Sequence, residues 1–116
     1  MGVKSFHELI IWQKGMELAK EVYLLTKKLP QEERFGIVSQ IQRSAVSIPS
    51  NIAEGSKRGT SKDYGRFLRI SMGSAAELET QLLLIRGIYG IDISDHINLL
   101  IEIQKMLEVI IRRLRI

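Results

Sequence analysis

Apolar residues recur along most of the chain at intervals of three and four, the spacing of one face of a helix. The pattern is clearest in residues 40–58, whose apolar row is Ile41, Ala45, Ile48 and Ile52. A polar row runs beside it and consists of Gln40, Ser44, Ser47, Asn51, Glu54 and Arg58. This segment therefore predicts an amphipathic helix that buries its apolar row and carries polar groups next to it.

A proline stands in the middle of this predicted helix. Pro49 has no N–H to donate to the carbonyl of Ala45, and its ring crowds that carbonyl. We therefore expect the helix to bend there, with Ser47 and Asn51 helping to satisfy the freed backbone groups.

The same periodicity predicts four helices and leaves no room for strands. They are expected from Glu8 or Trp12 to Leu29, from about Glu33 to Ser56, from Thr60 or Ser61 to Gly87 or Gly90, and from Ser94 to the C-terminus. The connections are short, so neighbouring helices should be antiparallel. The sequence predicts an all-α single domain over residues 1–116, an up-down-up-down four-helix bundle with a proline kink in its second helix.

The third and fourth predicted helices carry more apolar residues than one buried stripe can hold. Residues 82–85 read Leu-Leu-Leu-Ile in succession. The fourth helix has an expected core row of Ile97, Leu100, Ile101, Leu107, Ile111 and Leu114, and a second row of Leu99, Ile103, Met106 and Ile110. Surplus apolar surface is usually buried against another subunit, so we predict a homo-oligomer. A broad core stripe in a monomer is the alternative.

Small residues between 71 and 76 suggest that the third helix closely approaches the second. Gly73 inside a helix costs roughly 1 kcal/mol relative to alanine, so we expect it to have a packing reason. Glu77 is expected to be partly buried and to join Asn51 and Glu54 in a hydrogen-bonded polar layer that fixes helix register. An acid–base role for the carboxylate is the alternative.

The amino-acid composition excludes several classes of protein. The 116 residues contain no cysteine, which excludes disulfides and thiolate chemistry and agrees with a reducing compartment. No apolar stretch approaches a signal segment or the roughly 20 residues of a membrane span. We expect a cytoplasmic protein with no membrane partner. The net charge of +4 permits an anionic partner without demanding one.

The sequence does not have the residue spacings of the catalytic and metal-binding motifs considered below. Residues 55–62 have glycine, serine and lysine, but not the spacing of a phosphate-binding loop, and no strand precedes them. His7 and His96 lie in no metal-ligand spacing. The serines of the second helix lack a His or Lys at helical spacing that would activate them. We therefore predict that the protein is not an enzyme and needs neither a cofactor nor a metal.

Positive charge gathers in two places. Lys57, Arg58, Lys62, Arg66 and Arg69 surround the turn between the second and third helices, and Arg112, Arg113 and Arg115 end the chain. With the free N–H groups that begin the third helix, the first cluster is a candidate phosphate site. A solvated basic face is the alternative for both clusters.

The chain resembles the 23S rRNA intervening-sequence proteins. The resemblance is carried by Trp12-Gln13-Lys14, Leu29-Pro30, Glu33-Arg34-Phe35-Gly36, Ser39-Gln40-Ile41-Gln42-Arg43, Val46-Ser47-Ile48-Pro49-Ser50-Asn51-Ile52-Ala53-Glu54-Gly55, Gly73-Ser74 and Glu77-Leu78-Glu79. It covers nearly the whole chain and implies a four-helix bundle, often assembled as a ring of five. Related bundles are accessory proteins of diversity-generating retroelements and bind a reverse transcriptase and its RNA.

Two functional hypotheses follow. The first is a non-enzymatic, oligomeric bundle that associates with RNA through its basic surface, whether rRNA-like or another structured nucleic acid. The second is a protein-interaction scaffold, an accessory ring for a partner enzyme such as a reverse transcriptase.

Overall fold

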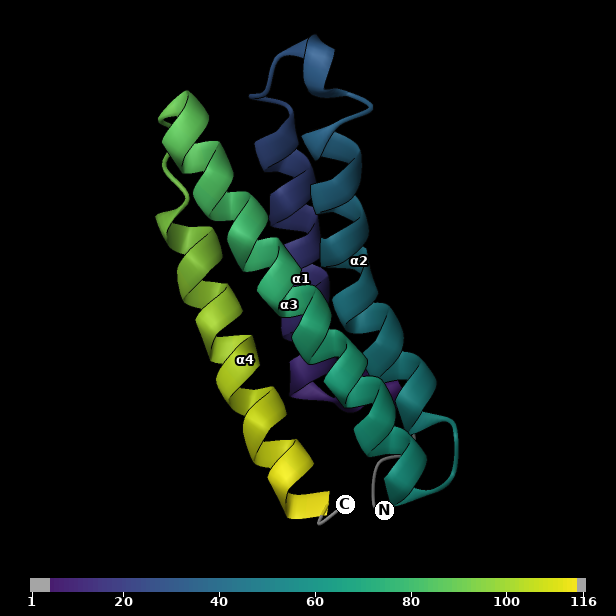
Figure 1. The fold of residues 1–116 in the computed structure, drawn as a ribbon. Helices are drawn as coiled ribbons and strands as arrows, with labels where there is room; N and C mark the ends of the chain where they lie inside the picture. Colours follow the sequence, from purple (N-terminus) through teal and green to yellow (C-terminus); the bar gives the residue numbers. More distant parts are fainter. Residues whose placement is uncertain (1–4, 115–116) are drawn as a thin grey trace.

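Four long helices form a rod 44 Å long and about 20 Å across in the computed structural model, which describes residues 5–114 (Figure 1). They are α1 (Ile10–Thr26), α2 (Ile37–Ser56), α3 (Ser61–Tyr89) and α4 (Ser94–Leu114), with short 3-10 turns at Phe6–Glu8 and Gln31–Glu33. All regular structure in this range is helical, and the predicted all-α bundle is confirmed. None of its helices is long and apolar enough to cross a bilayer.

Consecutive helices run antiparallel and pack side by side, and α1 also packs against α4, so the bundle has four sides (Figure 1). The first two helices are shorter than predicted, because the connection between them has its own structure. Pro30 is extended (φ −61°, ψ 149°), residues 31–33 form a 3-10 turn, and the non-helical Gly36 precedes α2. At the other connections, Thr60 caps α3 by accepting the Asp63 N–H, and left-handed Gly90 ends it.

The apolar row of α2 lies in the core: Ile41, Ala45, Ile48 and Ile52 are at most 1% exposed. The helix continues through Pro49 without a break. On α4 the expected rows are wrong at two positions, since Ile103 is fully buried and Ile101 is 39% exposed. Apolar residues at 99, 100, 101 and 103 are too closely spaced to define one face, and the contacts of α4 with both α1 and α3 decide which of them are buried.

Two close contacts fix the level of α2 against its neighbours. A Cβ on Gly15 of α1 would lie 3.3 Å from the Pro49 Cβ. On the other side, the Ser71 hydroxyl of α3 donates to the Ile48 carbonyl at 2.9 Å. Gly15, Pro49 and Ser71 therefore share one level of the rod.

The expectation about Gly73 is wrong. A Cβ at Gly73 would meet no atom within 4 Å, whereas Ser71, Ser74 and Ala75 are the buried small residues of α3. The glycine that does permit a close approach is Gly55, where a Cβ would lie 2.7 Å from the Phe67 Cβ.

These two glycines give a matched test. Gly55→Ala should lower the free energy of unfolding by about 1–3 kcal/mol, because the added methyl clashes with an atom bonded directly to the α3 backbone. Gly73→Ala should raise it by about 0.5–1 kcal/mol, because alanine is the better helix former and the space is open. Urea unfolding followed by circular dichroism measures both. Unchanged stability of Gly55→Ala would mean that the α2–α3 contact relaxes easily.

Candidate anion-binding end and apolar groove

The antiparallel topology brings both predicted basic clusters to one end of the rod. The α2–α3 turn and the C-terminal end of α4 lie at the same end, opposite the α1–α2 and α3–α4 connections (Figure 1). We call this region the basic end and define it by Lys57, Arg58, Lys62, Arg66, Arg69, Arg112 and Arg113, all of which are exposed. Arg115 lies outside the described residues. The two clusters are far apart in the sequence, and they share an end because of the antiparallel order that the sequence predicts.

An aromatic side chain organises two of these arginines. The guanidinium carbons of Arg58 and Arg66 lie 4.8 Å and 5.4 Å from the centre of the Phe67 ring. Arg58 also pairs with Glu54 at 2.6 Å, and Arg66 pairs with Asp63 at 3.5 Å. These exposed ion pairs are worth about 0–1 kcal/mol, so a phosphate can compete for either arginine. The spacing of apolar residues marks Phe67 as part of the core row of this helix, and only the structure shows its ring partly exposed against the two arginines.

A cleft of about 250 Å³ adjoins the start of α3. Its lining includes Gly55, Gly59, Thr60, Ser61 and Tyr64. The amides of the first helical residues have no acceptor one turn earlier, and the helix dipole gives this terminus partial positive charge. Burial raises the pKa of Tyr64, so its phenol is neutral at physiological pH. The arrangement suits an anion that also reaches the surrounding lysines and arginines.

The polar layer between α2 and α3 is made chiefly of serines. The Ser47 and Ser74 hydroxyls lie 2.7 Å apart, and Asn51 Nδ2 donates to both the carbonyl and the hydroxyl of Ser47. Of the three residues predicted for the layer, Asn51 takes part in these bonds. Glu54 and Glu77 are exposed, and Glu54 pairs with Arg58.

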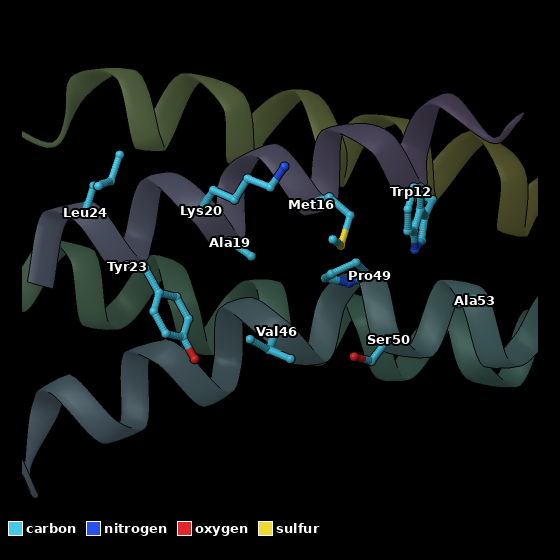
Figure 2. Close-up of a pocket in the computed structure, with 10 residues that line it drawn as sticks. All are labelled: Trp12, Met16, Ala19, Lys20, Tyr23, Leu24, Val46, Pro49, Ser50 and Ala53. Carbon is cyan, nitrogen blue, oxygen red and sulfur yellow. The ribbon is translucent and has the colours of Figure 1, made fainter. Parts of the chain in front are cut away.

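An apolar groove runs along the side of the rod formed by α1 and α2. Figure 2 shows Trp12, Met16 and Tyr23 of α1 directed towards α2, where Val46 and Pro49 stand opposite them. The groove has a volume of about 600 Å³, and its other lining residues are Ala19, Lys20, Leu24, Ser50 and Ala53. The sequence shows Trp12, Met16, Ala19 and Tyr23 as one row, but it cannot show that the row borders an open groove.

The described residues contain no group of three or more His, Cys, Asp or Glu side chains placed to hold a metal ion. The two surfaces described above are one cationic and one apolar.

Comparisons with known proteins agree with the architecture. The family model described as 23S rRNA-intervening sequence protein matches residues 7–112. A crystal structure from Bacteroides thetaiotaomicron VPI-5482, described as a protein of unknown function from the S23 ribosomal protein family, is 31% identical with a TM-score of 0.79. The alignment covers 88% of this chain and 98% of that one. No curated protein matches the chain.

The hydroxyl of Ser71 provides a test of the α2–α3 contact. Ser71→Ala should lower the free energy of unfolding by about 1 kcal/mol, because it removes a fully buried hydrogen bond to α2. Thr80→Ala is the control, since its exposed hydroxyl bonds only to Ala76 of its own helix. Thermal unfolding should leave the control at or above wild-type stability; an equal loss in both variants would argue against the interhelical bond.

Proposed function

This chain belongs to the 23S rRNA-intervening sequence protein family, and we propose that it is a non-enzymatic, oligomeric bundle that binds structured RNA in the cytoplasm through its basic end. The observation that carries the proposal is the gathering of seven described cations at one end of the rod. The family description, which names an insertion in ribosomal RNA, favours RNA as the anion.

The chemistry of the basic end favours binding to the phosphate backbone. Arg58 and Arg66 present planar guanidinium groups that match phosphate geometry, while Lys57 and Lys62 extend freely from the turn. Of the two aromatic residues beside the arginines, Phe67 lies against them and Tyr64 is buried. Because the basic end offers mainly contacts to phosphate, affinity should depend strongly on salt and weakly on RNA sequence.

A scaffold for a partner enzyme such as a reverse transcriptase is the second candidate, and one observation favours it. Phe35, in the connection at the end opposite the basic end, is 87% exposed, and the Arg34 guanidinium carbon lies 5.1 Å from its ring centre. Exposed aromatic and arginine side chains are common anchors of protein interfaces. Phe35→Ser would weaken such a partner's binding and leave RNA affinity unchanged.

Charge reversal tests the RNA proposal. Arg66→Glu combined with Arg69→Glu should lower affinity for a labelled structured RNA by roughly two orders of magnitude at low salt, because phosphate attraction becomes repulsion. It should also reduce the slope of log affinity against log salt by about 2. Fluorescence anisotropy at several salt concentrations measures both quantities.

The matched control is Lys27→Glu combined with Lys28→Glu, which changes net charge equally at the opposite end. It should retain most of the affinity. Equal losses in the two double variants would point to nonspecific attraction by net charge. Unchanged affinity after reversal of Arg66 and Arg69 would remove the basic end as the RNA site.

Assembly is tested separately. Light scattering at tens of micromolar should give a particle several times the 13.2 kDa monomer mass, about five times if the chain follows the ring that its resemblance implies. The physical reason is exposed apolar surface on α1, α2 and α3, including Leu24, Val46 and Leu84. A monomer at this concentration would contradict the oligomeric part of the proposal.

A further inference from the structure

We propose that a polar cleft between α2 and α3 binds a small zwitterion of the α-amino-acid class with a polar, uncharged side chain. The cleft has a volume of about 440 Å³, within the range of about 300–1,000 Å³ that is typical of small-molecule sites. It lies between residues 40–47 of α2 and 74–81 of α3, away from the α2–α3 turn, so it is separate from the basic end. Its lining includes Gln40, Arg43, Ser44, Ser74, Glu77 and Gln81.

The observation that carries the proposal is a buried amide without a hydrogen-bond partner. Gln81 is only 9% exposed, and its Oε1 accepts no hydrogen bond from any described residue. An unpaired buried polar group lowers stability, so such groups are rare unless they have a use. The last torsion of a glutamine side chain is soft, so this amide can turn towards a donor in the cleft without breaking a bond. It therefore suits a ligand that carries N–H groups.

A cation and an anion stand on opposite walls of the cleft without pairing. The Ser47 and Ser74 hydroxyls, 2.7 Å apart, fix the register of the two antiparallel helices. Arg43 and Glu77 each follow about one turn beyond this contact in the same direction, so they lie at one level. Both are exposed, and neither forms an ion pair within the described range. A ligand with both charges bridges them, its carboxylate on the guanidinium and its ammonium on the carboxylate.

The two walls also differ in the hydrogen bonds that they offer. On α3, Glu77 and Gln81 are four residues apart and therefore adjacent on one face, where their oxygens accept from an ammonium group. On α2, Gln40 and Arg43 are three residues apart and offer N–H donors to a carboxylate. This difference orients the ligand across the cleft, with its ammonium towards α3 and its carboxylate towards α2.

Hydroxyl groups form the buried part of the cleft. Ser44 and Ser74 are each 6% exposed. Ser44 donates to the Gln40 carbonyl at 3.1 Å and keeps its lone pairs for a ligand, while Ser74 shares a hydrogen bond with Ser47. An apolar side chain would cover these hydroxyls without pairing them, whereas a polar side chain forms hydrogen bonds with them. The site therefore favours serine, threonine, asparagine or glutamine over leucine as the free amino acid.

Isothermal titration calorimetry of the wild-type chain with these five L-amino acids tests the proposal. At least one of the four polar amino acids should bind at millimolar concentration or below, and leucine should bind roughly tenfold more weakly or worse. The amide and the N-acetyl derivative of the tightest ligand should each lose roughly tenfold or more in affinity. The first derivative lacks the carboxylate, and the second lacks the ammonium charge.

Three substitutions remove the groups that would hold the ligand. Arg43→Gln and Glu77→Gln each remove one charge, and Gln81→Met removes the amide at similar volume. Each should weaken binding roughly tenfold or more. Gln81→Met should also raise the melting temperature, because it replaces an unpaired buried amide with an apolar group. Arg86→Gln and Glu108→Gln are the matched controls, since both residues are exposed and lie outside the cleft, and they should bind as wild type does.

Every outcome decides for or against the site. Binding that is lost in the three cleft variants and kept in the two controls supports it, with circular dichroism showing wild-type helix content throughout. Should Gln81→Met fail to fold, the two exposed positions still decide, and unchanged affinity of Arg43→Gln and Glu77→Gln overturns the proposal. Equal affinity for the amide and N-acetyl derivatives, or for leucine, overturns the ligand class. No binding by any of the four polar amino acids also overturns it, as expected if another protein chain covers the cleft.

Discussion

The contacts of α2 with both neighbours at the level of Pro49 set the geometry of the rest of the molecule. Gly15 lets α1 approach the proline ring, and Ser71 donates to the adjacent Ile48 carbonyl from α3. A helix interior that contains proline loses a backbone hydrogen bond, yet α2 is continuous through Pro49. Beside the proline, Ser71 donates to the Ile48 carbonyl and Asn51 donates to the Ser47 carbonyl. These contacts fix the relative levels of three helices, and with them the position of every surface group.

Two different surfaces result from this arrangement. The antiparallel order places the α2–α3 turn beside the C-terminal end of α4, which concentrates cations at one end. The small residues at the α1–α2 contact leave the larger Trp12, Met16 and Tyr23 around an open groove. One surface is cationic and the other is apolar.

The four helices could be predicted from sequence because apolar periodicity reports directly on burial, as the row from Ile41 to Ile52 shows. Contacts that depend on the packing of a neighbouring helix could not be predicted from the sequence. The sequence predicted a close helix contact at Gly73, but the structure has open space beside it. The glycine at a close contact between α2 and α3 is Gly55. Glu77 was expected in a polar layer, yet the layer is satisfied by serines and Asn51, and the carboxylate is exposed. The basic end follows from the antiparallel order of the helices, which the short connections predicted, but the contact of Phe67 with Arg58 and Arg66 there depends on side-chain packing that the sequence does not show.

If the protein assembles and binds RNA as proposed, the direction of the rod would link the two properties. A single rod about 20 Å across presents only the seven described cations of the basic end, and binding through these phosphate contacts alone would weaken steeply with salt. A ring whose axis is parallel to its rods would direct every basic end to the same face and every Phe35 to the other. Several phosphate sites on one rigid face bind one RNA with a high effective concentration. In the proposed oligomer, contacts between copies would raise RNA affinity without touching RNA, by holding the basic ends in one plane.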